Sequence, residues 1–276
     1  YQGKFESIYC ESFSNFHGGG YSDAVATGTA ALYVSLAALE LPKMSEVLCS
    51  PITDPGTISS IILLNLKPKL IDSAKDDYNI DFNEFKKRVS KKTSCVIIVH
   101  SAGYPVDMKK IFEYCKLNGI KVIEDCSQAH GAVYNKKRVG NFSDIAAFST
   151  MYRKNSISGG SGGIIHTKNL SLYKKVLSYA DRGKPRLKKN FDDRNPNFFL
   201  HPALNLHTDE ISCAIGISSI KRLEDTRKKR LEIVNKISNK LEKKSEVCYG
   251  YQLSSDASPF FYPIWVKEAK IKVNKI

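Results

Sequence analysis

The stretch 96–125 constrains the fold of this chain more than any other part of the sequence. It reads as a continuous apolar strand at 96–100, a loop, a helix at 107–118 and a second apolar strand at 120–125. Strands that are apolar on both faces and joined by a helix are typical of a parallel sheet covered by helices on both sides. We therefore predict an α/β fold, in which ligands bind at the carboxyl ends of the strands.

Lys154 stands between a predicted strand at 145–148 and a glycine-rich run at 159–163. A lysine amine forms a Schiff base with a carbonyl when burial or a nearby cation lowers its pKa. The glycines would let the backbone approach a flat cofactor closely. Because the chain has 33 lysines, most of which must be solvated, Lys154 gains weight only from matching motifs elsewhere.

Asp125 ends the second apolar strand, and Gln128 follows three residues later. A carboxylate at a strand end often does no more than cap the next helix. In a pyridoxal phosphate enzyme, however, a carboxylate beside the pyridine nitrogen keeps that nitrogen protonated, so that the ring can withdraw electrons. Gln128 would then bind an oxygen on the ring.

A third motif, 27–32, lies between a predicted strand at 21–25 and an Ala- and Leu-rich helix at 32–41. A glycine turn at the start of a helix offers free backbone N–H groups and the positive end of the helix dipole, which together favour an anion. The alternative interpretation is a plain N-cap at Thr27 or Thr29.

Other segments yield coarser predictions. We expect a helix within 1–20 that buries Phe5, Ile8, Tyr9, Phe13 and Phe16, an irregular loop at 184–202, and a strand at 260–266. A helix capped by Thr208 should bury Ile211, Ile215 and Leu223.

Composition argues against several classes of protein. The formal charge of +14 would favour binding to a polyanion such as a nucleic acid. However, the densest basic run, 221–244, is interleaved with acidic residues, which is typical of a solvated helix and not of a nucleic-acid-binding surface. No apolar run of about eighteen residues predicts a membrane span, and no leader peptide is expected. Seven scattered cysteines without a CxxC pair indicate reduced thiols, a cytoplasmic location and no metal site.

Four motifs, taken in order, resemble the DegT/StrS family of pyridoxal phosphate-dependent sugar aminotransferases. They are 27–32, 122–131, Phe148-Ser149 with Lys154-Asn155 and the glycine run, and Asn205 with 214–216. The resemblance covers about residues 5 to 245 and implies a fold type I enzyme. Its large domain, residues 1–225, would be a three-layer α/β/α structure around a mostly parallel sheet, followed by a small, incomplete C-terminal α+β domain at 226–276. It also implies a homodimer with both active sites at the interface.

The resemblance assigns a role to each candidate residue. Lys154 would form the Schiff base with pyridoxal phosphate, Asp125 would pair with the pyridine nitrogen, and Gln128 would contact the ring hydroxyl. The phosphate would be bound by the turn at Gly28, the backbone N–H groups of Thr29 and Ala30, and the hydroxyl of Ser149. Asn205 would reach the phosphate held by the partner subunit.

Three positions depart from the family pattern. Asp54 stands where members usually have an aromatic residue that stacks on the cofactor, His207 replaces a usual Arg or Lys, and the segment after Lys154 carries one extra residue. All three fall where cofactor and substrate would meet. We therefore expect a less usual member of the class.

The predicted activity is transfer of an amino group from an amino acid, glutamate in the first instance, to a keto sugar in surface-polysaccharide or amino-sugar biosynthesis. The sugar would be nucleotide-linked or a free acidic one. Two alternatives remain open. One is a catalytically silent sensory or regulatory protein, and the other is a sugar dehydratase on the same scaffold, whose members carry histidine at the position of Lys154.

Overall fold

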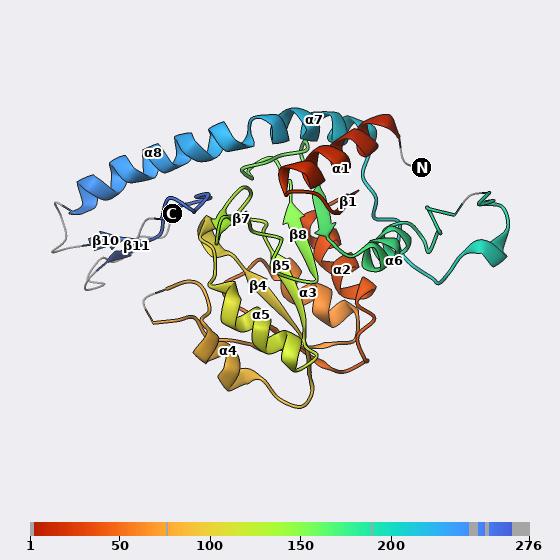
Figure 1. The fold of residues 1–276 in the computed structure, drawn as a ribbon, viewed down its shortest axis with the longest axis horizontal. Coiled ribbons are helices and arrows are strands. Elements are labelled where there is room, and N and C mark those ends of the chain that lie inside the picture. The colour runs from red at the N-terminus through yellow and green to blue at the C-terminus, as the bar shows by residue number, and fades with distance from the viewer. Residues whose placement is uncertain (1–2, 76, 189, 243–247, 252–253, 267–276) are drawn as a thin grey trace, which may run out of the picture.

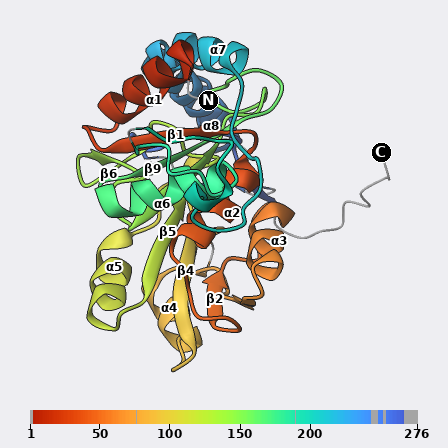
Figure 2. The same ribbon diagram turned by 90° about the vertical axis from the view of Figure 1, so that its right-hand side faces the viewer.

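A seven-stranded sheet with helices on both faces forms the centre of the molecule (Figures 1 and 2). This computed structural model describes residues 3–75, 77–188, 190–242, 248–251 and 254–266. In spatial order the strands are β1 (Tyr21–Val25), β9 (Gly163–Thr167), β8 (Ile145–Ser149), β5 (Lys121–Asp125), β4 (Thr93–Val99), β2 (Glu46–Cys49) and β3 (Lys67–Leu70). β9 runs antiparallel to both of its neighbours, whereas the strands from β8 to β3 pair in parallel. The predicted α/β class with a mostly parallel sheet is confirmed.

Eight α-helices are described: α1 (Lys4–Phe16), α2 (Gly28–Ala38), α3 (Pro55–Leu63), α4 (Phe82–Arg88), α5 (Met108–Leu117), α6 (Leu170–Ala180), α7 (Glu210–Lys221) and α8 (Leu223–Glu242). Helices α2, α3 and α6 share a core with one face of the sheet. On the opposite face, α1 and α7 cover the β1–β9–β8 side, while α4 and α5 cover the β4–β5 side. These three layers match the predicted α/β/α arrangement.

Strand β4 shows why both faces of the sheet are buried. Cys95 and Ile97 belong to the core with α2, while the alternate residues Val96 and Ile98 belong to the core with α5. Successive side chains on a strand point to opposite faces, so a strand covered on both sides must be apolar throughout. All four side chains are fully buried.

The packing between α1 and α7 corrects two predictions. Tyr9 and Phe13 are buried as expected and Phe16 is partly buried, but Phe5 is 44% and Ile8 37% exposed. Helix α7 is capped by Asp209, which accepts the N–H of Ser212, and not by Thr208.

The buried face of α7 also differs from the predicted one. It consists of Cys213, Gly216, Ser219 and Ile220, and Gly216 abuts the ring of Tyr9 so closely that a Cβ there would lie 2.6 Å from it. Consequently Ile211 points outward and is 77% exposed, and Ile215 is 38% exposed. Of the three residues expected in the core, Leu223 is buried, at the start of the next helix.

The long helix α8 carries the chain away from the sheet (Figure 1). A hairpin of β10 (Cys248–Gly250) and β11 (Ile264–Val266) lies near it, and together they supply the helix and strands of the predicted C-terminal part. A domain boundary at 225 would cut the first turn of α8, whose Leu223 lies in the core shared with α1 and α7. The division at this point stays a prediction. The predicted strand 260–266 is shorter than expected, because β11 begins at Ile264.

Small elements complete the described chain. They are the hairpin of β6 (Val133–Tyr134) and β7 (Lys137–Arg138), and the single 3₁₀ turns Ser101–Gly103 and Pro196–Phe198 within otherwise irregular loops. No helix among the described residues combines the length and apolar character that a membrane crossing requires. Among the residues whose side chains the structure describes, six cysteines are free and buried: Cys10, Cys49, Cys95, Cys115, Cys126 and Cys213.

Candidate active site

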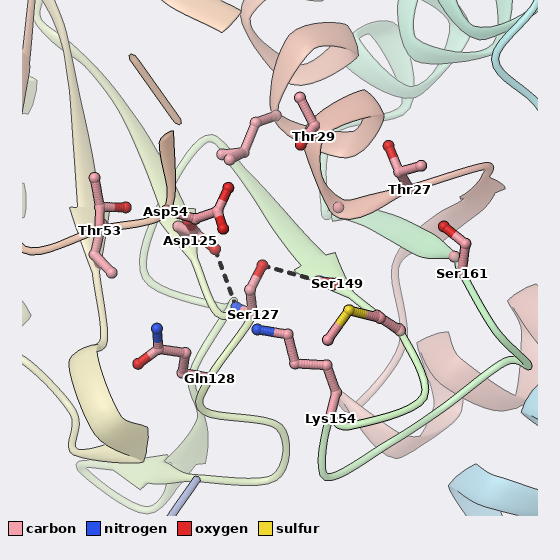
Figure 3. A pocket seen from close by; sticks show the side chains of 15 residues that line it. Thr27, Thr29, Thr53, Asp54, Asp125, Ser127, Gln128, Ser149, Lys154 and Ser161 are labelled. Carbon is pink, nitrogen blue, oxygen red and sulfur yellow. Dashed lines mark hydrogen bonds between the residues drawn. The ribbon is translucent and has the colours of Figure 1, made fainter. Parts of the chain in front are cut away.

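A cavity of about 200 Å³ opens at the carboxyl ends of β1, β5 and β8 (Figure 3). Six of the predicted residues line it, although they come from three separate motifs of the chain: Gly28, Thr29, Asp125, Gln128, Ser149 and Lys154. Ala30 and Asn205 are not among its lining residues. The sheet therefore brings the motifs together as the parallel topology predicts.

Asp125 is buried at the end of β5, with 4% of its surface exposed. One carboxylate oxygen accepts the backbone N–H of Ser127 at 3.0 Å, and the other lies 3.5 Å from the hydroxyl of Thr57. Burial raises the pKa of Asp125, and the Ser127 hydrogen bonds and the charge of Lys154 offset part of that effect. The Ser127 contact caps a turn and not the helix that the alternative interpretation expected, because the element after β5 is the strand β6. The second carboxylate oxygen, whose contact with Thr57 is long, can still accept a hydrogen bond from a ligand.

Gln128 is oriented by its side-chain oxygen. This oxygen accepts the backbone N–H of Ala102 at 2.7 Å, in a turn where Ala102 adopts the left-handed conformation with φ of 58°. The amide nitrogen consequently lies on the cavity side of the group (Figure 3). A donor held in this way suits an anionic or phenolic oxygen.

The start of α2 forms an anion cradle beside Ser149. The hydroxyl of Thr27 accepts the N–H of Ala30 at 2.9 Å, so Thr27 is the N-cap and Ala30 already has a partner. No hydrogen bond among the described residues uses the first-turn N–H groups of Gly28 and Thr29, which α-helix geometry leaves free. Gly28 sits so close to Ser149 that a Cβ there would lie 2.5 Å from the Ser149 Cβ. Glycine therefore brings the helix terminus and the serine hydroxyl to one spot.

Lys154 reaches into the cavity from the wall opposite Asp54 and Asp125 (Figure 3). Burial lowers the pKa of Lys154, and the carboxylates of Asp125 and Asp54 oppose that shift. The amine lies 4.6 Å from the ring centroid of Phe260. A buried amine with a lowered pKa is neutral more often, and the neutral form is the nucleophile.

Asp54 lines the cavity at the position where an aromatic residue was expected. It caps α3 by accepting the N–H of Gly56 at 2.8 Å, and its side chain is exposed. The cavity is thus faced by a carboxylate, and not by a ring, from the 51–57 stretch.

Asn205 lies in a neighbouring cavity of about 430 Å³ that also includes His207 and Asp209. Ser161 borders both cavities. Asn205 forms an isolated β-bridge with Asp181. Within one chain, therefore, Asn205 stands beside the Lys154 cavity and not in it.

A second polar cluster contains His100, Glu124 and Cys126. The nitrogen, oxygen and sulfur atoms with which these side chains could coordinate a metal lie within 4.8 Å of one another. His100 accepts the N–H of Val106 on Nδ1, so Nε2 donates to Glu124 at 3.0 Å. Glu124 accepts three further hydrogen bonds, from the backbone of Gly140 and Phe142 and the hydroxyl of Ser143, each 2.8 Å long. Because the imidazole and the carboxylate are saturated by protein donors, they form a structural network and not a set of metal ligands.

Three residues at the site were assigned no role from the sequence: Ser127, Thr57 and Phe260. Ser127 cross-links the strand ends, since its N–H binds Asp125 and its hydroxyl accepts the N–H of Ser149 at 3.0 Å. The Asp-x-Ser spacing, which is typical of a side chain capping the N–H two residues on, was a usable signal. Thr57 and Phe260 carried none, because their contacts with Asp125 and Lys154 are purely tertiary.

Comparison with known proteins agrees with this geometry. The sequence profile of the DegT/DnrJ/EryC1/StrS aminotransferase family matches residues 1–276. GDP-perosamine synthase of Escherichia coli O157:H7 is 29% identical over 78% of this chain and 57% of its own length. The dTDP-3-amino-3,6-dideoxy-alpha-D-galactopyranose transaminase of Aneurinibacillus thermoaerophilus is 32% identical over 80% of this chain and 58% of its own length.

Among solved structures, NtdA from Bacillus subtilis with bound cofactor PMP superimposes with a TM-score of 0.87. It is 25% identical, and the match covers 96% of this chain and 59% of NtdA. The chain thus spans a little under three fifths of the length of these three proteins.

Proposed function

The chain belongs to the DegT/DnrJ/EryC1/StrS aminotransferase family, and from this premise we propose that it is a pyridoxal phosphate-dependent enzyme that transfers an amino group to a keto sugar. The observation that carries the proposal is the convergence of Lys154, Asp125, Gln128 and the Gly28–Ser149 cradle on one cavity. A silent protein would have no need to keep all of these groups together. A dehydratase of this scaffold would lack the lysine.

The residues of the cavity fit pyridoxal phosphate group by group. The free N–H groups of α2 and the Ser149 hydroxyl suit the phosphate, the Gln128 amide suits the ring hydroxyl, and the Asp125 carboxylate suits the protonated ring nitrogen. When bound, the cofactor supplies an aldehyde that bonds to amines and a ring that withdraws electrons from them.

Lys154 and Asp125 have distinct tasks in this arrangement. The Lys154 amine binds the cofactor covalently and, once an amino substrate has displaced it, accepts and returns a proton at Nζ. Both roles need the neutral amine, and burial favours the neutral form because it lowers the pKa of Lys154. Asp125 remains a hydrogen-bond acceptor that holds a proton on the ring nitrogen. Burial of both groups removes competing water and strengthens their mutual attraction.

For the substrate we propose a keto sugar, either linked to a nucleotide or free and acidic, with glutamate as the amino donor. The names of the GDP-perosamine synthase and the dTDP-sugar transaminase each contain a nucleotide-linked sugar, and the formal charge of +14 favours anionic substrates of both kinds. The exposed Asp54 stands at the cavity in place of an aromatic ring, which supports a less usual member of the family. The free buried cysteines support a cytoplasmic location.

The first experiment tests the covalent link. Purified protein is mixed with pyridoxal phosphate, reduced with borohydride and digested, and the modified peptide should contain Lys154. Glutamate should shift the absorbance of the loaded protein to shorter wavelength, and a keto sugar, screened among nucleotide-linked and free acidic ones, should reverse the shift. Lys154→Ala should show neither the covalent label nor the shift. If the loaded wild-type protein does not respond to any common amino donor, the aminotransferase proposal fails and the regulatory alternative takes its place.

We also propose that the active unit is a homodimer in which Asn205 serves the partner's site. The 184–202 loop projects from the body (Figure 1), and it exposes Leu187 and Leu200; Leu204 and Ile211, farther along the chain, are exposed as well. An exposed set of this kind supports an interface.

Mixing two inactive variants tests this assembly. Lys154→Ala and Asn205→Ala each damage every site of their own dimers, but a mixed dimer has one site with both residues intact. An equimolar, re-equilibrated mixture should regain about a quarter of wild-type activity if subunits assort at random. A mixture no more active than its components, or a fully active monomer, would rule out the shared site.

A further inference from the structure

The 254–262 segment returns to the cavity from the C-terminal part of the chain and contacts the backbone around it. The N–H of Ser258 donates to the carbonyl of Gly103 at 2.9 Å, and the N–H of Phe260 donates to the carbonyl of Ala102 at 2.8 Å. Gly103 has φ of +94°, and a Cβ there would lie 2.0 Å from the Ser258 carbonyl oxygen. Only glycine allows this approach.

Two arginines and an asparagine hold the same segment in place. Arg230 donates to the carbonyl oxygens of Pro259 and Phe260, both at 3.2 Å, and Arg227 donates to those of Ser255 and Ala257. Asn155, the residue after Lys154, is buried and donates to both the carbonyl and the hydroxyl of Ser258 at 3.0 Å. The segment is therefore bound at several points and not merely adjacent to the cavity.

These contacts place the ring of Phe260 against the Lys154 amine, with 4.6 Å between the nitrogen and the ring centroid. An ammonium group within about 6 Å of an aromatic centroid is attracted by the electron-rich ring face. The same turn connects Phe260 with Gln128. The N–H of Ala102 donates to the Gln128 side-chain oxygen, and the carbonyl of Ala102 accepts the N–H of Phe260. Position and chemistry both make Phe260 a neighbour of the reactive nitrogen.

We propose that Phe260 is a positioning residue that holds the Lys154 ammonium group whenever the lysine is not bonded to the cofactor. The identity of the cofactor rests on the proposed function, but the contact itself does not. Because the ring stabilises free Lys154, it competes with covalent attachment. It keeps the displaced amine beside the cavity and ready to return.

The test uses Phe260→Leu and, as a matched control, Phe261→Leu, whose neighbouring ring is 47% exposed. Without cofactor, acetylation of Lys154 by acetic anhydride is followed by mass spectrometry as a function of pH. Asp125 and Asp54, the charged groups that act on Lys154, stay in place in both variants. Loss of the ring should shift the midpoint of the pH profile to lower pH and accelerate acetylation below the midpoint about three- to tenfold. A change in the plateau alone would report easier access and would contradict the proposal, as would an effect of equal size in Phe261→Leu.

A second measurement separates a positioning role from a structural one. Phe260→Leu should tighten pyridoxal phosphate binding about three- to tenfold when Lys154 is present, and should have no effect in a Lys154→Ala background. Weaker binding in both backgrounds would mean that Phe260 only supports the fold, and would overturn the proposal. If Phe260→Leu is unfolded by circular dichroism, Phe260→Met provides the ring-free variant. If the wild-type protein binds no pyridoxal phosphate, the proposed function fails, while the acetylation profile still decides the role of Phe260.

Discussion

Two neighbouring carboxylates, on opposite faces of β5, differ in how many hydrogen bonds the protein donates to them. Glu124 and Asp125 are adjacent in sequence and both are buried. Glu124 accepts four hydrogen bonds, whereas Asp125 accepts one short hydrogen bond and one long one. Burial raises the pKa of each group. At Glu124 the hydrogen bond from His100, together with the backbone donors, outweighs burial and lowers the pKa overall, whereas at Asp125 burial prevails and raises it.

The difference shows that the number of fixed donors around a buried acid distinguishes a structural group from an available one. The protein satisfies Glu124 completely, and its charge stabilises the fold. Asp125 keeps accepting capacity on the side of the cavity, where a ligand can supply the missing donor. The folded protein without ligand must therefore bear a cost at Asp125 that cofactor binding would relieve.

The largest effect should follow from removing the saturated carboxylate. Glu124→Ala leaves His100 and three other donors without their acceptor, so the free energy of unfolding should fall by about 3–5 kcal/mol. Urea denaturation measures this change. The exposed Glu113→Ala on α5 is the control and should stay within about 0.5 kcal/mol of wild type. A loss of similar size in both variants would refute the contrast.

Asp125→Asn should instead damage activity. The amide cannot hold a proton on the ring nitrogen by charge, so turnover should fall at least about 100-fold. Cofactor affinity should change little, because the phosphate contacts remain. Steady-state kinetics and a pyridoxal phosphate titration separate the two quantities. Near-normal turnover would show that Asp125 serves only as the cap for Ser127.

The smallest effect is a difference in the pH dependence of stability in cofactor-free protein. The raised pKa of Asp125 means that the folded state binds its proton more tightly, so this group's contribution becomes less favourable as pH rises above the ordinary value of 3.8. The lowered pKa of Glu124 gives the opposite sign, and its contribution is lost as pH falls below the ordinary value of 4.5. The free energy of unfolding should therefore be measured from about pH 3 to about pH 7. Relative to wild type, Asp125→Asn should become more stable as the pH rises, and Glu124→Gln should become less stable. Parallel profiles would remove the distinction.

Much of this arrangement could be predicted from the sequence, because it depends on local patterns. Continuous apolar strands specified the parallel sheet, and strand ends located Asp125 and Ser149 at one edge. What failed depended on tertiary packing. Ile211 follows a helical apolar pattern, yet the close contact of Gly216 with Tyr9 turns a different face of α7 inward. Phe260 reads as part of a strand, and nothing local reveals that backbone carbonyls and Arg230 draw it to Lys154.

The contact between Asn155 and Ser258, which are 103 positions apart, joins parts of the chain that are synthesised at different times. A chain emerging from the ribosome can pair β5 with β8 and place Lys154 in its cavity long before Ser258 and Phe260 have been synthesised. The cradle of α2 and the lysine are synthesised before the ring that holds the lysine. Because Phe260 is synthesised last of these groups, an incomplete chain would already present the lysine amine without the ring that holds it.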